Sequence, residues 1–312
     1  MNIGKVPGNV LKRSVVNLIG KGPRTGVDAA AMKSKDGSTV FAATGVGLVD
    51  TDIAPMLAVF KACNNVWAAG GRVLGVEAAF MISDRTKERD LKKLTRQTLS
   101  ATRLCHTELV GGHTEVSDAV ARPISTVTAI GELSGNVFTV RDIRAGMGIV
   151  MTKWAGLEEA AILLNNQNTL DLLKNRFSPS YMENFSNYTE WLSVEEEAGI
   201  AKEFGDVIMH DNSDGGVFGS LWDLAEGSGL GFEVNLRDIP VRQEIIELAY
   251  LCELNIYRMK SQGSLLIISE RAGELAEYIN KAGIPAAYIG SFTDNNDKMI
   301  RVEDEIRYLE RV

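Results

Sequence analysis

The order of strand-like and helix-like segments is the feature of this chain that most constrains its fold. Two strand-like runs, one on each side of a turn at 35–37, precede an apolar helix over 55–69. A strand over 73–82 and a polar helix over 85–105 follow, and then two more strands, the second over 124–133. The order ββαβαββ departs from strict βαβ alternation. It predicts an α+β layer with the helices on one face of the sheet.

A Gly-rich and turn-rich segment over 134–150 separates this layer from a second set of strands and helices. The chain has 312 residues, which is enough for two domains of ordinary size. We therefore expect an N-terminal domain over 1–140 and a C-terminal domain over 141–312. In the second domain, a short strand over 206–210 leads through the turn-forming sequence DNSDGG into a helix that starts near 217.

Charge and cysteine content exclude several classes of protein. Lys and Arg total 33 and Asp and Glu total 41, giving a net charge of −8, which argues against a nucleic acid as partner. No uninterrupted apolar run approaches the ~18 residues of a membrane span, so we expect no membrane association. Cys63, Cys105 and Cys252 are far apart, and the N-terminus lacks the apolar core of a signal peptide. These features predict a cytoplasmic protein without disulfides.

The segment Leu109–Val116, with the sequence LVGGHTEV, is the first candidate for a binding site. We expect a strand to end at Gly111 and Gly112, where the absence of side chains lets a ligand approach the backbone. The polar residues His113, Thr114 and Glu115 follow at once. The alternative is a tight strand-to-loop turn whose polar groups satisfy one another.

The second candidate is HDNSDGG at 210–216, between a strand and a helix. Asp211 and Asp214 are three residues apart beside the helix start, where carboxylates attract a cation and free N–H groups attract phosphate. The competing interpretation is that Ser213 or Asp214 simply caps the helix. The chain contains no GxxxxGK[ST] loop, so it is not a classical P-loop protein.

Together, the two segments resemble the AIR synthase-related superfamily, which includes PurM, thiamine-monophosphate kinase, selenophosphate synthetase and the hydrogenase-maturation protein HypE. GGHTEV followed by RPISTVTAIGEL is similar to the HypE pattern, as are HDNSDGGVFGSLWDLAEGSGLGFEV and the later SQGSLLI. The opening GKVP and the strand GVDAAAM also fit, so the resemblance covers roughly 1–305.

The resemblance implies a two-domain PurM-like α+β fold, in which the N-terminal sheets of two copies pair into a barrel in a homodimer. It implies that ATP and Mg²⁺ bind in a cleft between the domains and that an oxygen of the substrate is phosphorylated. In HypE, that oxygen belongs to a carbamoyl group on a C-terminal Cys, and dehydration gives a thiocyanate.

With this resemblance, the expected site residues fall into three groups. His113 and Asp211 are expected near the phosphates. The expected Mg²⁺ ligands are Asp28, Asn65, Glu115 and Asp214. Residues expected around the nucleotide are Gly111, Gly112, Thr114, Ser213, Gly215 and Gly216, with Lys5 or Lys21 added on charge alone to neutralise the γ-phosphate.

Three positions that are acidic in the family are not acidic in this chain. They are occupied by Val27, Gly45 and Asn65. Because carboxylates hold the cations that bridge phosphate oxygens, these losses predict weakened metal binding. Asp50 and Asp52 are nearby in sequence and are candidates to replace them.

Two functions from different classes therefore remain open, and a third option is a purely structural dimer that binds no nucleotide. The first is a HypE-like, Mg²⁺- and ATP-dependent enzyme acting on a small-molecule or protein-thiol-linked substrate of unknown identity. The second is a catalytically silent homodimer that binds a nucleotide or metabolite and acts as a regulator or scaffold with a degraded metal site. The last cysteine of the chain is Cys252, so the carbamoyl chemistry of HypE is not expected in cis.

Overall fold

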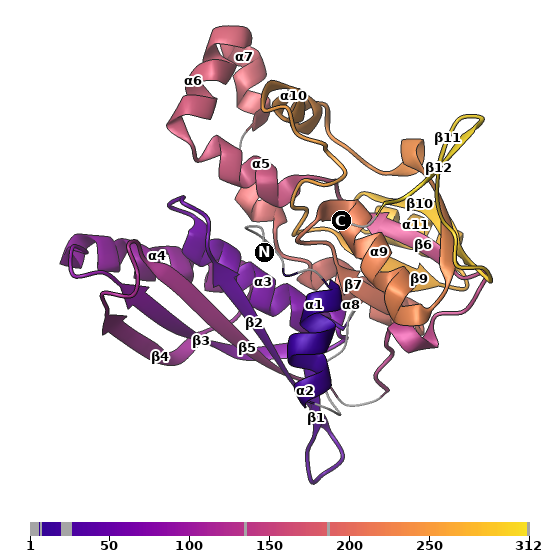
Figure 1. Cartoon of the computed structure of the whole chain (residues 1–312), viewed down its shortest axis with the longest axis horizontal. Helices are drawn as coiled ribbons and strands as arrows, with labels where there is room; N and C mark the ends of the chain where they lie inside the picture. Colours follow the sequence, from indigo (N-terminus) through magenta and orange to yellow (C-terminus); the bar gives the residue numbers. More distant parts are fainter. Residues whose placement is uncertain (1–5, 7, 20–26, 134–135, 186–187, 311–312) are drawn as a thin grey trace.

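Two mixed β-sheets, one from each half of the chain, form the framework of the computed structural model (Figure 1). The structure describes residues 6, 8–19, 27–133, 136–185 and 188–310. Within these residues, no helix combines the length and the apolar character that crossing a bilayer requires.

The N-terminal half begins with a helical segment made of α1 (Gly8–Leu11), a π-helical turn (Lys12–Val16) and α2 (Asn17–Ile19). The elements that follow are β1 (Ala30–Lys33), β2 (Thr39–Gly47), α3 (Ala54–Ala68), β3 (Arg72–Ile82), α4 (Glu88–Leu104), β4 (Leu109–Val116) and β5 (Ile124–Leu133). This is the predicted order ββαβαββ, and the α+β class is confirmed.

The first sheet has the strand order β1-β2-β5-β3-β4. Its neighbouring strands are antiparallel except for β3 and β4, which are parallel. Helices α3 and α4 lie on the same face of the sheet (Figure 1), and residues of β2 alternate between burial under this layer and exposure on the other side. We call the uncovered side the open face; the exposed apolar residues Val46, Met81 and Ile130 lie on it.

Helix α3 is buried on nearly every side. It has Pro55 in its first turn, where a missing N–H costs nothing, and it is followed by Gly70 with φ +84°. Every residue of the helix except Lys61 and Asn65 is buried. Such a helix can bury so much surface only because it packs against both halves of the molecule.

Among the described residues, the C-terminal half contributes seven strands and all of the remaining helices. They are β6 (Gly148–Thr152), α5 (Leu157–Leu164), α6 (Gln167–Arg176), α7 (Pro179–Met182), α8 (Glu195–Phe204), β7 (Ile208–Asp211), α9 (Gly216–Ser228), β8 (Gly231–Asn235), α10 (Gln243–Leu251), β9 (Leu265–Ser269), α11 (Ala272–Lys281), β10 (Ala286–Thr293), β11 (Lys298–Val302) and β12 (Glu305–Tyr308). Short 3₁₀ turns cover Val140–Asp142, Glu183–Phe185, Tyr188–Trp191 and Leu236–Asp238.

The second sheet has the order β12-β11-β8-β10-β6-β9-β7. Strand β6 is buried throughout and pairs with β9 and β10, although it begins inside the segment 134–150 that the sequence predicted to be rich in turns. A strand buried on both faces has no alternating pattern to reveal it, and the flanking glycines hid it further.

Helix α3 joins the two halves. Besides covering the first sheet, it packs against β7 and α8. The side chain of Asn64 donates to the carbonyl of Leu192 at 2.8 Å and accepts from the backbone N–H of Val194 at 3.2 Å. The α3 side chains therefore define the seam between the two halves.

Candidate functional site

Five charged or acidic side chains from both halves of the molecule come together beside α3. They are Lys61, Glu158, Asp211, Asp214 and Lys260, and we call them the interdomain cluster. Lys61 comes from α3, Glu158 from α5, Asp211 from the end of β7, and Asp214 from the turn before α9. The cluster thus combines the predicted HDNSDGG segment with a helix of the N-terminal half.

Asp214 is held by two lysines. One carboxylate oxygen is ion-paired with the Lys61 ammonium, and the other lies 3.7 Å from Nζ of Lys260. The competing interpretation of a helix cap is wrong, because Gly215 occupies the N-cap of α9 and no side chain caps it. The Asp214 side chain instead reaches across the seam to the N-terminal half.

Two glycines shape the turn that presents Asp214. Gly215 and Gly216 have φ values of +86° and +63°, a conformation that residues with a Cβ seldom adopt. A Cβ on Gly216 would also lie 2.6 Å from the carbonyl oxygen of Tyr257 and 2.5 Å from that of Met259. The close approach brings the start of α9 against the loop that carries Lys260.

Burial changes the protonation of the acids in the cluster. Burial raises the pKa of Asp211 well above its usual value, helped by the nearby charge of Asp28, and both carboxyl oxygens of Asp211 lack a hydrogen-bond partner among the described residues. Burial likewise raises the pKa of Glu158 to about 7, although Lys260 and Lys61 oppose the shift. Burial thus favours the protonated form of Asp211, while Asp214 is the carboxylate that the lysines bind.

Lys61 stays charged in this environment. Burial acts to lower the pKa of its ammonium, but Asp214, Glu158 and Asp211 together raise that pKa above its ordinary value. Its side chain is 23% exposed, so the charge is held in place by neighbouring acids rather than by bulk water.

A second charged pair crosses the seam next to the cluster. Nδ1 of His210, on β7, lies 2.8 Å from Oδ1 of Asp28, and the side chains are 9% and 10% exposed. Burial acts to lower the pKa of His210, but the Asp28 carboxylate outweighs it, so this pKa lies above its usual value. The backbone N–H of Asp211 also donates to Asp28 at 3.3 Å. Both contacts of Asp28 are thus with β7, the strand that carries Asp211.

At Gly45, one of the three positions that are acidic in the family, packing explains why this chain has no acid. A Cβ there would overlap the carbonyl oxygen of Ala58, because β2 lies directly on the backbone of α3. An aspartate does not fit this arrangement. Asn65 is half-buried on α3, four residues after Lys61 and on the same side of the helix. Val27, at the third position, is exposed.

The GGHTEV segment is not the loop that the sequence predicted. Strand β4 runs without interruption from Leu109 to Val116, so the expectation that it ends at Gly111 and Gly112 is wrong. The strand continues because its residues pair in parallel register with β3 as far as Val116 opposite Ile82. It is the edge strand of the sheet, and nearly all of its residues are exposed.

The side chains of His113 and Glu115 lie on the open face, away from the interdomain cluster. His113 pairs in register with Ala79, and Glu115 pairs with Met81. Nε2 of His113 lies 3.3 Å from Oε2 of Glu115. In Figure 1, β4 lies at the far edge of the first sheet, whereas β7 and α9 belong to the other half. Within one chain, the structure therefore does not bring Glu115 and Asp214 together.

The remaining expected residues divide in the same way. Ser213, Gly215 and Gly216 belong to the turn beside the cluster, and Thr114 belongs to the exposed strand β4. Lys5 and Lys21 lie outside the described residues.

Sequence reasoning missed Lys61, Lys260 and Glu158. A signal for the first was present: Lys61 is the one charged residue in the otherwise apolar and amide-bearing sequence of α3. A single charged residue in an otherwise apolar, buried helix indicates a partner of opposite charge nearby. Nothing local distinguishes Lys260 or Glu158, because the chain must fold before they meet Asp214.

The residues expected to bind Mg²⁺ do not fit a divalent cation within this chain. Asp28 is bound by His210, Asp214 by lysines, and Glu115 lies on the open face. Among the described residues, no three His, Cys, Asp or Glu side chains form a group that could hold a metal ion. Of these carboxylates, Asp214 belongs to the interdomain cluster, and the two ammonium groups beside it repel a divalent cation. The positive charge of this site is supplied by lysine.

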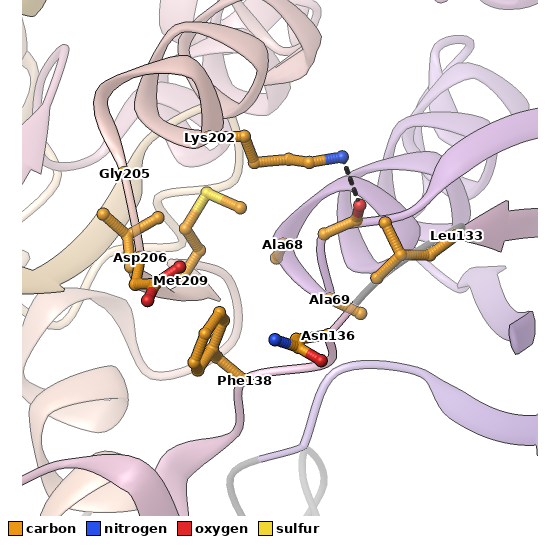
Figure 2. Close-up of a pocket in the computed structure, with 11 residues that line it drawn as sticks. Ala68, Ala69, Leu133, Asn136, Phe138, Lys202, Gly205, Asp206 and Met209 are labelled. Carbon is orange, nitrogen blue, oxygen red and sulfur yellow. Dashed lines mark hydrogen bonds between the residues drawn. The ribbon is translucent and has the colours of Figure 1, made fainter.

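A separate cavity of about 230 Å³ opens at the C-terminal end of α3 (Figure 2). Lys202 of α8 extends across it and donates to the carbonyl of Gly70 at 2.6 Å. Phe138, Asn136 and Met209 line the rest of the seam there. None of the sequence-predicted site residues lines this cavity.

Two family models match the chain. The model for the AIR synthase related protein C-terminal domain matches 144–303, and the model for the N-terminal domain matches 26–133. Among characterised proteins, the chain is similar to the carbamoyl dehydratase HypE of Bradyrhizobium diazoefficiens, with 24% identity over 79% of this chain and 70% of that protein. HypE of Azotobacter vinelandii shows 24% identity over 79% of this chain and 72% of the relative.

Solved structures share the fold. A HypE–HypF complex contains a chain that superposes with a TM-score of 0.79 at 18% identity, covering 97% of this chain and 99% of that one. HypE in complex with ATP superposes with a TM-score of 0.73 at 19% identity over 100% and 96% of the two chains. AaThiL, complexed with AMPPCP and TMP, gives a TM-score of 0.72 at 16% identity over 97% of each chain. The two-domain architecture is therefore the PurM-like one that the sequence predicted.

Proposed function

Because the chain belongs to the AIR synthase-related family, we propose that it is a HypE-like enzyme that binds ATP between its two halves. It transfers the γ-phosphoryl group to an oxygen of its substrate and releases ADP; where the reaction is a dehydration, that oxygen then leaves as phosphate. The observation that carries this proposal is the meeting of Lys61, Lys260 and the DNSDGG turn at one place. The ATP-bound and AMPPCP-bound structures of relatives support a nucleotide as the ligand of this fold. The substrate is a small molecule or a group carried on a protein thiol.

The residues of the cluster have complementary roles in this proposal. Lys61 and Lys260 bind the phosphate chain, because ammonium groups pair with phosphate oxygens. Ser213, Gly215 and Gly216 form the turn along which the phosphates lie. Asp211 has a raised pKa, and both of its carboxyl oxygens lack a hydrogen-bond partner among the described residues, so it is the group that exchanges a proton with an oxygen of the substrate or the phosphate.

We further propose that the protein works as a homodimer built on the open face. Val46, Met81 and Ile130 are exposed there, and β4 offers an unpaired edge. An exposed apolar face and a free strand edge both favour association with another copy. A homodimer also gives Gly111, Gly112, His113, Thr114 and Glu115 a ligand role, since they reach a nucleotide only through a second copy.

Calorimetric titration with ATP tests the nucleotide proposal. We expect saturable binding of one ATP per chain, followed by ADP release when the substrate is supplied. Absence of binding at millimolar ATP contradicts the proposal. Sedimentation tests the homodimer: we expect a dimer at micromolar concentration and a monomer for Ile130→Glu, which places a charge on the open face.

A catalytically silent protein that binds a nucleotide is the second candidate. The observation that favours it is the ion pair between Asp214 and Lys61, in which each group engages the other instead of a phosphate or a cation. Under this alternative, ATP binds but no ADP is released with any substrate. The ADP assay therefore separates the two functions after binding has been measured.

A further inference from the structure

Lys61 is an unusual residue to place in α3. The helix is otherwise buried, with Asn65 as its other partly exposed residue, and it carries no other charge. Placing an ammonium group in such a position costs free energy unless an anion compensates it. The Lys61 side chain crosses the seam and finds that anion in Asp214.

The surroundings of Lys61 are those expected of a bound cation. Asp214 contacts it, and Asp211 and Glu158 lie close enough to act on it electrostatically. These three acids come from the C-terminal half, whereas the ammonium comes from the N-terminal half. A divalent ion bridging two halves through carboxylates would use the same kind of neighbours.

Lys260 is a second ammonium group beside Asp214, on the side opposite Lys61. Its Nζ lies 3.7 Å from Oδ1, while Lys61 occupies Oδ2. Both oxygens of this carboxylate thus face ammonium groups. The site is arranged to receive an anion in exchange for Asp214 and not to receive a second cation.

We infer that the Lys61 ammonium takes the place of a divalent cation in this site, so that the protein binds the triphosphate of ATP without requiring a metal ion. This inference rests on the proposed function. The entering phosphates compete with Asp214 for Lys61 and Lys260, and the displaced carboxylate turns away from them.

The inference predicts opposite effects for two neighbouring variants. Lys61→Met removes the charge that binds phosphate and weakens ATP binding. Asp214→Asn removes the competitor of the phosphates and strengthens ATP binding. If Asp214 instead bound a metal ion that carries the nucleotide, Asp214→Asn would weaken binding.

Lys202→Met is the matched control. Lys202 is also a lysine of the seam, but it binds the carbonyl of Gly70, beyond the C-terminal end of α3. Lys202→Met removes the same positive charge as Lys61→Met and leaves the same unbranched methionine side chain. Lys61→Arg keeps the charge, and chemical unfolding of each variant verifies that it is folded.

The experiment is an ATP titration of these proteins by calorimetry, once in EDTA and once in Mg²⁺. We expect the wild-type dissociation constant to agree within about threefold between the two buffers. In EDTA, Lys61→Met should bind ATP at least about tenfold more weakly than the wild type, and Asp214→Asn at least about threefold more tightly. Lys202→Met should bind about as the wild type does, and Lys61→Arg should bind more tightly than Lys61→Met.

Several outcomes would overturn the inference. Wild-type binding that is tenfold tighter with Mg²⁺, or weakened binding in Asp214→Asn, leaves the proposed ATP site standing but removes Lys61 as its cation. If ATP binds in neither buffer, the proposed function fails, and a titration with Mn²⁺ alone, followed by electron paramagnetic resonance, decides the role of Lys61. Mn²⁺ bound by Lys61→Met but not by the wild type supports the inference, and Mn²⁺ bound by the wild type overturns it.

Discussion

The His210–Asp28 pair makes the stability of the seam depend on pH in a defined direction. Because Asp28 holds the pKa of His210 above its ordinary value near 6.5, the folded protein retains a proton that the unfolded chain releases. The stabilisation by this pair is complete below about pH 6.5. It is lost as the pH rises through the folded pKa of His210.

The perturbation that isolates this effect is Asp28→Asn. The two side chains are 9% and 10% exposed, so removing the carboxylate leaves a charged imidazolium buried without its counterion. Breaking such a pair costs about 3 kcal/mol of the free energy of unfolding at pH 6, where His210 is charged. Above the folded pKa of His210 the imidazole is neutral, and we expect the cost to be smaller.

Urea unfolding of the wild type and Asp28→Asn at pH 6 and pH 8.5 measures the difference. The control is Glu195→Gln, which breaks a His–carboxylate contact of the same 2.8 Å length at His106, whose side chain is 79% exposed. An exposed pair of this kind contributes about 0–1 kcal/mol. Equal effects of the two variants at pH 6, or an Asp28→Asn effect that grows with pH, would refute the reasoning.

Three further predictions concern other buried contacts. Because the pKa of Glu158 is raised to about 7, the free energy of unfolding of the wild type should fall by about 3 kcal/mol between pH 4.5 and pH 7, and that of Glu158→Gln should not. Parallel pH profiles for both proteins would contradict this. Lys153→Met should lower the free energy of unfolding in urea by about 3–5 kcal/mol, because it leaves Glu197, which is 1% exposed and 2.9 Å away, without its ion-pair partner. Gly45→Asp, which restores a family acid, should lower the melting temperature, because its Cβ overlaps the carbonyl of Ala58.

The strand and helix order of the N-terminal half could be predicted from sequence because each element shows its own periodicity. The apolar stretch 73–82 and the alternating β2 produced strands, and Pro55 indicated the start of α3. Strand β6 could not be predicted, because a strand buried on both faces carries no alternation and its neighbours are glycines.

The candidate site was predicted in part for a related reason. The DNSDGG turn was found because its glycines and acids are adjacent in sequence, and its position beside the seam follows from β7. The GGHTEV segment was expected to be a bend because of its two glycines, yet pairing with β3 outweighs the local preference. The lysines that hold Asp214 are far apart in sequence, so only the folded structure brings them together.

The binding of ATP between the two halves is the central claim, and a crystal structure of the complex with a non-hydrolysable ATP analogue tests it most directly. We expect the phosphate chain to contact Nζ of Lys61 and of Lys260, with Asp214 displaced from at least one of them. An analogue bound elsewhere, with the Lys61–Asp214 ion pair intact, would contradict the account.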